Sequence, residues 1–353
     1  MRIVIPRESV AGERRTSATP ETVKKMIRLG ADVAIESGAG DAVGYNDSLY
    51  SELGAEIVSD RAALMGSADM VLRLRKPEPA DIDMMKPGCI HVSYLDPFNE
   101  RDLIRTLAAK EITAVSMEMI PRSTRSQKMD ALSSQANLAG YVAVMLAAAQ
   151  LPSIFPMLMT PAGTLKPAKI FIIGAGVAGL QAIATAKRLG GRVTAFDTRP
   201  VVAEQVQSLG GKFLEIDLGD TGQTADGYAK ELTPEQVELQ RQAQKSVIAD
   251  SDVVITTAQV FGRKPPVLVT RDMIEGMAPG AVIVDMAAET GGNVEGSVPN
   301  ETVVVDGVTI VGTANLANEV ARDASQMYAN NLFNLVEDTW DTDAKTFVLD
   351  MEN

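Results

Sequence analysis

One segment constrains the fold more than any other: a glycine-rich turn between an apolar strand and a helix. The residues Lys169-Ile-Phe-Ile-Ile173 predict a buried strand, which runs directly into Gly174-Ala-Gly-Val-Ala-Gly179. Good helix formers follow from Leu180 to Leu189, and a second apolar strand then ends at Asp197. A strand, a GxGxxG turn, a helix, a second strand and an acid in this order predict a βαβ unit that binds a dinucleotide.

Each glycine of this turn has a separate expected task. Gly174 permits the tight turn, Gly176 lets the backbone approach a pyrophosphate, and Gly179 lets the helix pack against the strand. Val177 and Ala178 lie at the helix N-terminus, whose free N–H groups and partial positive charge attract phosphates. The alternative is a glycine-rich turn used only for packing, but here the turn, the helix, the second strand and the acid all stand in register.

Asp197, which is 18 residues beyond Gly179, indicates which dinucleotide is bound. A carboxylate at this place can accept both hydroxyls of the adenosine ribose and repels a 2′-phosphate, so it favours NAD(H) over NADP(H). Thr198 follows it, and Arg199 is of the residue type that binds a 2′-phosphate. We take the nearer carboxylate as decisive and predict Asp197, Thr198 and Arg199 as cofactor-binding residues.

The order of strands and helices predicts two Rossmann-like, doubly wound parallel-sheet domains of the α/β class. Apolar runs alternate with amphipathic helices in residues 1–135, and a second βα series starts at Lys169. The segment from Leu132 to Leu151 predicts a long helix that is apolar nearly all round and buried between the domains, followed by prolines typical of an extended connection. The predicted domains are residues 1–135 plus 319–353, which form a discontinuous domain completed by a C-terminal helix, and residues 136–318.

Composition excludes several classes of function. A net charge of −13 over 353 residues argues against binding to nucleic acid or to anionic lipid. One cysteine, Cys89, and one histidine, His91, exclude an internal disulfide and a thiolate or poly-histidine metal site, and they disfavour Ser-His-Asp catalysis. We expect Cys89 to be a small buried hydrophobe.

The most apolar stretch, Leu138 to Ala149, is shorter than the roughly 20 residues that span a bilayer. The first residues are typical of a strand and lack the apolar stretch of a signal peptide. These features predict a soluble, cytoplasmic chain.

Two polar segments are further candidates for ligand binding. In the segment before the long helix, Gln127, Asp130 and Ser133 are spaced so that on a helix they would form one polar row able to hold a carboxamide. The alternative is a capping and surface segment. The second segment, residues 217–230, is apolar only at Leu218 and Tyr228. Loops of this length are often lids, and Tyr228 favours a lid over the nucleotide rather than a plain surface loop.

Several stretches resemble the NAD(H)-binding component of proton-translocating nicotinamide nucleotide transhydrogenases, in the alanine dehydrogenase/PNT family. They are Pro6–Glu8 with Gly12–Arg15, Arg122–Ser134, Gly174–Arg188 and Gly227–Glu231. The run Ser-Gln-Lys-Met-Asp-Ala-Leu-Ser-Ser-Gln-Ala-Asn-Leu-Ala-Gly that begins at Ser126 is not a general Rossmann feature. The resemblance covers essentially the whole chain.

The resemblance implies roles and partners. Arg122, Gln127, Asp130 and Ser133 would be the catalytic residues around the nicotinamide and its ribose, and Tyr228 would lie on a mobile loop that closes over NAD(H). The chain would be a homodimer, peripheral at the inner face of the plasma membrane, paired with membrane-spanning and NADP(H)-binding subunits. Hydride would pass directly between the two nicotinamides, coupled to proton translocation, with no metal in this chain.

Alanine dehydrogenase is the alternative function within the same family. That enzyme typically uses a lysine and a histidine for its chemistry, and Arg75 and Asp96 stand at the aligned positions here. Arg15 matches its carboxylate-binding arginine but also fits a transhydrogenase. A third possibility, from another class, is a non-enzymatic NAD(H)-sensing module.

Overall fold

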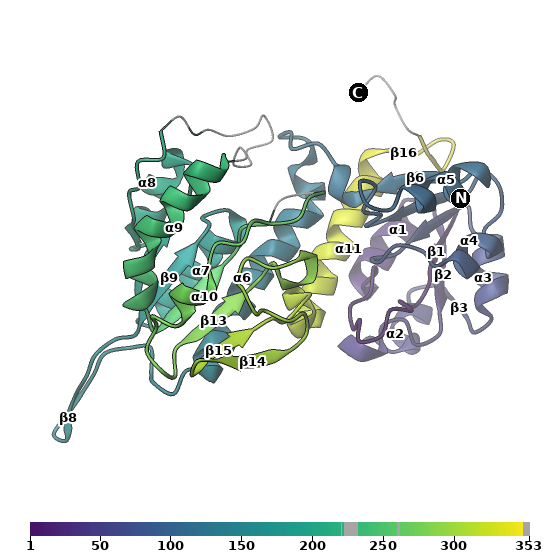
Figure 1. Ribbon diagram of the computed structural model, residues 1–353. Coiled ribbons are helices and arrows are strands. Elements are labelled where there is room, and N and C mark those ends of the chain that lie inside the picture. The colour runs from purple at the N-terminus through teal and green to yellow at the C-terminus, as the bar shows by residue number, and fades with distance from the viewer. Residues whose placement is uncertain (220, 222–231, 260–261, 349–353) are drawn as a thin grey trace. The chain divides into compact units, whose positions relative to one another are not determined.

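The computed structural model describes residues 1–219, 221, 232–259 and 262–348 (Figure 1). The chain divides into two compact units, Met1–Gln135 with Val320–Asn353 and Ala136–Glu319. The second break lies one residue after the predicted one. That each unit is a domain with a function of its own stays a prediction, and the two units are described separately below.

The first unit contains a fully parallel six-stranded sheet. Its order is β3-β2-β1-β4-β5-β6, so the chain moves outward from β1 in one direction and then returns to β4 on the other side. This order is that of a doubly wound α/β sheet, in which ligands bind at the carboxyl ends of the strands near the reversal. The strands are β1 (Arg2–Ile5), β2 (Asp32–Glu36), β3 (Glu56–Val58), β4 (Met70–Leu72), β5 (Ile90–Ser93) and β6 (Thr113–Ser116).

Helices cover both faces of this sheet because successive strand residues point to opposite sides. Ile3 and Ile5 lie in one hydrophobic core with Leu332 of the last helix, whereas Val4 lies in another core with Leu64. The hydroxyl of Tyr328 also donates to the Arg73 carbonyl oxygen over 3.0 Å, so the C-terminal helix completes the first unit. The helices are α1 (Pro20–Arg28), α2 (Asp47–Ser51), α3 (Arg61–Ser67), α4 (Pro79–Met84), α5 (Arg101–Ala109) and α11 (Ala321–Asp338), followed by the short strands β16 (Trp340–Asp341) and β17 (Thr346–Phe347).

The second unit contains a seven-stranded sheet of the same topology with a hairpin at one edge. Its order is β11-β10-β9-β12-β13-β15-β14, and only the pairing of β14 with β15 is antiparallel. The strands are β9 (Lys169–Ile173), β10 (Arg192–Phe196), β11 (Lys212–Phe213), β12 (Val253–Thr256), β13 (Val282–Asp285), β14 (Thr302–Val305) and β15 (Val308–Val311). The helices of this unit include α7 (Val177–Arg188), α8 (Ala203–Ser208), α9 (Pro234–Ala249) and α10 (Arg271–Ile274). The predicted fold class, two Rossmann-like parallel-sheet units, is confirmed.

The long helix α6 (Ala131–Gln150) has 20 residues, and by length and composition alone it could cross a membrane. Its contacts are those of a helix packed in a folded core. A Cβ on Gly140 would lie 2.2 Å from the carbonyl oxygen of Ala178, which shows how closely the two backbones approach. The prediction that this helix is buried all round was wrong, because Tyr141 and Met145, one turn apart, are 40% and 39% exposed. A sequence that is apolar on every side does not reveal which side is left uncovered.

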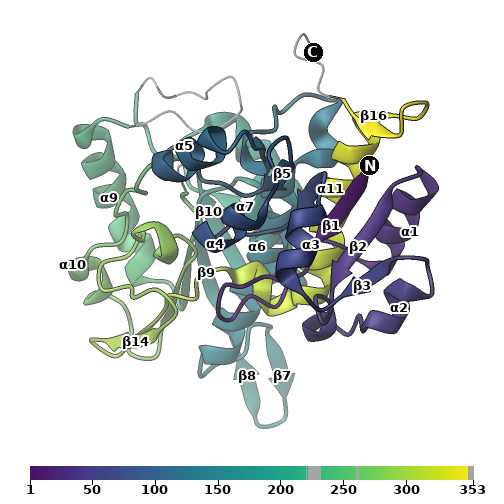
Figure 2. The same ribbon diagram turned by 90° about the vertical axis from the view of Figure 1, so that its right-hand side faces the viewer.

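The proline-rich connection after α6 contains a hairpin that was not predicted. Strands β7 (Leu158–Thr160) and β8 (Gly163–Leu165) pair antiparallel, and all six of their residues are exposed. The hairpin extends away from the sheet of its own unit, and its two strands lie side by side (Figures 1 and 2). Its strands are only three residues long, too short for a clear period-two pattern.

Candidate cofactor-binding site

Two of the three fingerprint glycines are required by the protein's own contacts. Gly174 has a φ of +103°, and a Cβ on it would lie 2.3 Å from Oγ1 of Thr257. A Cβ on Gly179 would lie 1.9 Å from the carbonyl oxygen of Gly174, because α7 starts directly against the end of β9. Any other side chain at either position would therefore displace the turn.

Thr257, which the sequence gave no local reason to single out, fixes this turn from the neighbouring strand. Its hydroxyl lies 3.2 Å from the carbonyl oxygens of both Ile173 and Gly174. Thr257 directly follows β12, which pairs with β9 at the point where the strand order reverses. That position was the available signal, since ligands bind outside the carboxyl ends of strands at the reversal.

Gly176 is different, because nothing in the described protein requires a glycine there. Its φ of −75° and ψ of −166° are accessible to other residues, and a Cβ on it would meet no described heavy atom within 4 Å. It precedes α7, whose first N–H groups have no partner within the helix. The space in front of Gly176 is thus an open cradle of the kind that holds a phosphate.

Asp197 lies at the carboxyl end of β10, beside this cradle, and its carboxylate makes four hydrogen bonds. One oxygen accepts from the backbone N–H and the Nε–H of Arg199, each at 2.9 Å. The other accepts from the backbone N–H of Ala175 at 2.8 Å and from a terminal N–H of Arg199 at 2.9 Å. The hydrogen bond to Asp197 is the largest cause of a raised pKa of Arg199, and partial burial acts against it. The two residues that the sequence set against each other as selectors are an ion pair.

The other predicted cofactor residues lie around the same turn, with one exception. Val177 and Ala178 begin α7, and Val177 is exposed. The carbonyl oxygen of Thr198 accepts a hydrogen bond of 2.8 Å from the hydroxyl of Thr221. Tyr228, and with it the predicted lid, lies outside the described residues.

The loops that follow β12 and β13 are held together by two buried polar residues that were not predicted either. The Asp285 carboxylate accepts from the hydroxyl of Thr256 at 3.2 Å and from the backbone N–H groups of Ala287 and Asn293 at 3.0 Å. The side-chain amide of Asn293 donates to the carbonyl oxygen of Ala258 at 3.1 Å. These bonds build the wall next to the fingerprint turn.

The predicted nicotinamide residues lie in the first unit. The Asp130 carboxylate caps α6 by accepting from the N–H of Ser133 at 2.9 Å and from its hydroxyl at 2.6 Å. Arg122 approaches the same carboxylate, with 3.7 Å from its Nε to the nearer oxygen. The structure therefore brings Arg122, Asp130 and Ser133 together.

Gln127 does not join them in a helical row. Residues Ser126–Met129 form one turn of 3₁₀-helix and α6 begins only at Ala131, so a row of three on a single helix was the wrong geometry. Asp130 favours ending the preceding turn because its side chain bonds the backbone of the next one. Gln127 lies on this turn and is only partly buried.

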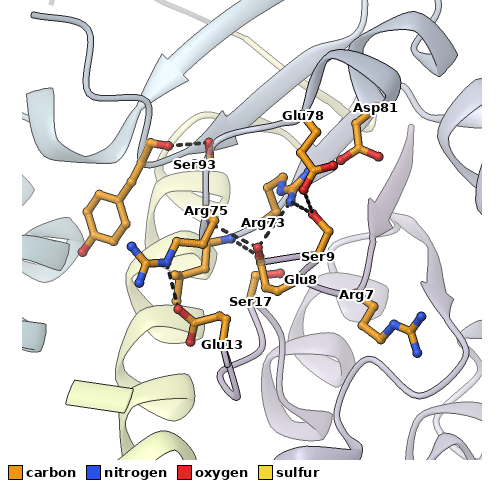
Figure 3. Close-up of polar contacts among 12 residues, drawn as sticks. Arg7, Glu8, Ser9, Glu13, Ser17, Arg73, Arg75, Glu78, Asp81 and Ser93 are labelled. Carbon is orange, nitrogen blue, oxygen red and sulfur yellow. Dashed lines mark hydrogen bonds and ion pairs between the residues drawn. The ribbon is translucent and has the colours of Figure 1, made fainter. Parts of the chain in front are cut away.

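The carboxyl ends of β1 and β4 in the first unit carry a buried ionic cluster instead of an open cradle (Figure 3). Arg73 bonds Asp81 at 2.5 Å and pairs with Glu8 at 3.4 Å, and none of its side chain is exposed. Glu13 accepts from Nε of Arg75 at 2.8 Å. Burial raises the pKa of Glu8, opposed by the charge of Arg73 and by backbone hydrogen bonds. Glu8, Glu13 and Asp81 thus each have a cationic partner.

Arg15 completes the cluster. Its guanidinium donates twice to Glu13 and once to the amide oxygen of Gln135, each at 2.8 Å. Although burial acts against ionisation, the hydrogen bonds and charge of Arg15, together with the charge of Arg75, hold the pKa of Glu13 at about 2. The carboxylate of Glu13 thus occupies the arginine that alanine dehydrogenases, by the resemblance above, would use for a substrate carboxylate.

The single histidine and the single cysteine are structural. His91 is fully buried on β5 with its Nε2 3.0 Å from the Ser93 hydroxyl, and burial with the nearby charge of Arg73 lowers its pKa to about 3. Cys89 is a buried free thiol whose pKa burial raises to about 12. The prediction of a small buried hydrophobe at Cys89 is confirmed.

Comparison with known proteins places both units in one family. The model of the alanine dehydrogenase/PNT N-terminal domain matches residues 4–139, and that of the C-terminal domain matches residues 143–353. The chain is 44% identical to an NAD(P) transhydrogenase alpha subunit of Rhodospirillum rubrum, over 100% of this chain and 94% of that protein.

Solved structures agree in fold. The crystal structure of a transhydrogenase from Sinorhizobium meliloti matches with a TM-score of 0.87 and 41% identity, over 98% of this chain and 96% of that one. An L-alanine dehydrogenase structure matches with a TM-score of 0.79 and 27% identity, over 94% of this chain and 88% of that one. The chain therefore belongs to the alanine dehydrogenase/PNT family, in which it is more similar to these transhydrogenase subunits than to this alanine dehydrogenase.

Proposed function

We propose that this chain is the NAD(H)-binding component of a proton-translocating nicotinamide nucleotide transhydrogenase. It presents NADH for direct hydride transfer to NADP⁺ that is bound on a partner subunit. When bound, the nicotinamide supplies the hydride, and the chain's own residues bind and orient it. The observation that carries the proposal is the fingerprint turn, where Gly176 is the one glycine that the described protein does not itself require.

The residues of the second unit suit NAD(H). The first turn of α7 offers N–H groups to the pyrophosphate, and Asp197 offers a carboxylate to the adenosine ribose. In the first unit, Arg122, Asp130 and Ser133 form a connected polar group. We assign these three, with Gln127, to the nicotinamide and its ribose.

Transhydrogenation is favoured over amino acid oxidation by the first unit. An amino acid dehydrogenase needs a proton acceptor for the amine, and the aligned positions hold Arg75, bonded to Glu13, and Asp96, bonded to Asn99. His91 is buried and its lowered pKa keeps it neutral. Hydride transfer between two nicotinamides needs no such base, only a fixed distance and angle between the rings.

A second copy of the chain is proposed as one partner, and the exposed apolar surface of the second unit supports it. Met159 on β7 is 72% exposed, and Met157 and Leu165 are exposed beside it. An open groove of about 790 Å³ lies near the base of this hairpin, lined mainly by apolar residues including Leu151, Ile154 and Phe155. Exposed apolar patches of this kind mark interaction sites. The other partners are the membrane-spanning and NADP(H)-binding subunits, which would hold the chain at the cytoplasmic face of the membrane.

Three assays on the purified chain separate the candidate functions. They are NAD⁺ reduction with L-alanine, NADPH formation from NADH and NADP⁺ by the chain alone, and the same reaction after adding an NADP(H)-binding transhydrogenase subunit. We expect no turnover in the first two assays and turnover in the third. Turnover of L-alanine would establish a dehydrogenase, and tight NADH binding without turnover in any assay would establish a sensor.

A further inference from the structure

The Asp197–Arg199 ion pair occupies the acceptor positions that a ribose needs. A carboxylate has about four lone-pair positions for hydrogen-bond donors. All four on Asp197 are taken, by the backbone N–H groups of Ala175 and Arg199 and by two side-chain N–H groups of Arg199. The pair is also shielded, since the side chains of Asp197 and Arg199 are 7% and 14% exposed.

Only the two side-chain bonds of this set can be given up without changing the backbone. The N–H of Ala175 belongs to the fingerprint turn, which Gly174 and Thr257 hold in place, and the N–H of Arg199 belongs to the chain segment after β10. The Arg199 guanidinium, in contrast, is carried on a flexible stem. A ribose diol would donate two hydrogen bonds to Asp197, the same number that this side chain donates.

From this count we infer that the Arg199 side chain is an internal competitor of the adenosine ribose, and that it sets both affinity and specificity at this site. The inference rests on the proposed binding of NAD(H) by the second unit. NADH binding replaces the two guanidinium bonds, so part of the binding energy is offset by the broken ion pair. The released guanidinium then lies beside the 2′ position, where it lowers the repulsion that Asp197 exerts on a 2′-phosphate.

Two consequences follow for variants of Arg199. Arg199→Gln removes the charge and the two-pronged donor, so NADH should bind about 3- to 10-fold more tightly, the factor expected for losing a net charged hydrogen bond from the competing state. NADPH should bind no better or more weakly, so that discrimination between the two dinucleotides rises. Arg199→Lys keeps the charge but has only one donor group, and we expect an intermediate NADH affinity.

The test is a fluorescence titration of the full chain with NADH and with NADPH, for the parent and for R199Q, R199K and R192Q. Arg192 is the matched control because it is exposed at the other end of the same strand β10, and its loss should change neither affinity. Weaker or unchanged NADH binding in R199Q overturns the inference. If the parent itself does not bind NADH, the proposed function fails as well, so the two failures are distinguishable.

A measurement on the parent protein guards against a variant that does not fold. The Nε–H of Arg199 donates to Asp197, so its ¹⁵N resonance reports on the ion pair directly. We expect this resonance to shift and its exchange with water to accelerate at saturating NADH. An unchanged resonance under saturation would mean that the pair persists in the complex and would overturn the inference.

Discussion

The two sheets of the chain have matching topology around β1 and β9 but differ at the carboxyl ends of their strands. In the first unit, Arg73 and Arg15 fill this edge with buried ion pairs to acids of the same unit. In the second unit, Gly176 leaves the edge open, with no described atom within 4 Å of an added Cβ. The same fold therefore supplies one edge that is satisfied internally and one that is built for a ligand, and the difference lies in the residues that follow the strands.

The largest expected effect is on the filled edge. Arg73→Met should lower the free energy of unfolding by about 3–5 kcal/mol, because it leaves Glu8 and Asp81 buried with one cationic partner fewer. Urea denaturation measures this, and NADH titration of the folded variant should show an unchanged affinity. Arg105→Met, at an exposed pair with Asp102, is the control and should have little effect on stability. Equal stabilities of the two variants would remove the distinction between the edges.

The open edge should respond in the opposite way. Gly176→Val should weaken NADH binding at least about 100-fold, or about 2.8 kcal/mol, since the side chain fills the space of the pyrophosphate. Its Tm should shift by less than about 4 °C, the change that 1 kcal/mol produces in a domain of this size. Gly179→Ala is the contrasting variant, because its Cβ collides with the Gly174 carbonyl and should lower the Tm further. Unchanged NADH binding by Gly176→Val would contradict an open phosphate cradle.

Gln127 tests whether the first unit contributes to the chemistry despite its filled edge. Gln127→Asn keeps the amide but shortens its reach, so hydride transfer in the mixture with the NADP(H)-binding subunit should slow by up to about 100-fold. NADH affinity should change little, because the turn from Gly174 to Gly179 and Asp197 supply most of the binding. Single-turnover kinetics beside a binding titration give both quantities. Binding that falls as steeply as the rate would make Gln127 an ordinary contact, and no change in either would make it a surface residue.

The smallest expected effect is on selectivity within the open edge. Asp197→Asn should weaken NADH binding by about 1–3 kcal/mol, the range for losing a charged hydrogen-bond partner. We expect the lower end of this range, because the variant also frees Arg199 from its partner. Discrimination against NADPH should fall, since the charge that repels the 2′-phosphate is gone. Titrations with both dinucleotides check this, and equal discrimination in variant and parent would exclude Asp197 as the selector.

The sequence predicted most of the second unit because its signals are local. The turn from Gly174 to Gly179 follows β9 directly, and the spacing to Asp197 is set by a single helix and a single strand. The five core strands of that unit were also found, since buried parallel strands are continuous apolar runs. Short elements such as β3 and the β7–β8 hairpin were not, because three residues carry too little pattern.

Contacts between residues distant in sequence account for the rest. Thr257 is 83 residues from Gly174, and the buried partners of Arg73 lie at positions 8 and 81, so no periodicity connects them. The polar row at Gln127, Asp130 and Ser133 failed as a helix because one carboxylate that could sit in a helix instead caps the next one. The pairing of Asp197 with Arg199 is local, yet a sequence shows only that both charges are present.

The central claim, that this chain holds NADH and passes its hydride directly to a partner's NADP⁺, is tested most directly by isotope transfer. NADH deuterated at the transferring C4 position is mixed with the chain, the NADP(H)-binding subunit and NADP⁺, and the NADPH formed is analysed by mass spectrometry. Our account predicts that the deuterium is retained in NADPH, and that no transfer occurs when this chain is omitted or carries Gly176→Val. Loss of the deuterium to water, or equal transfer with Gly176→Val, would contradict it.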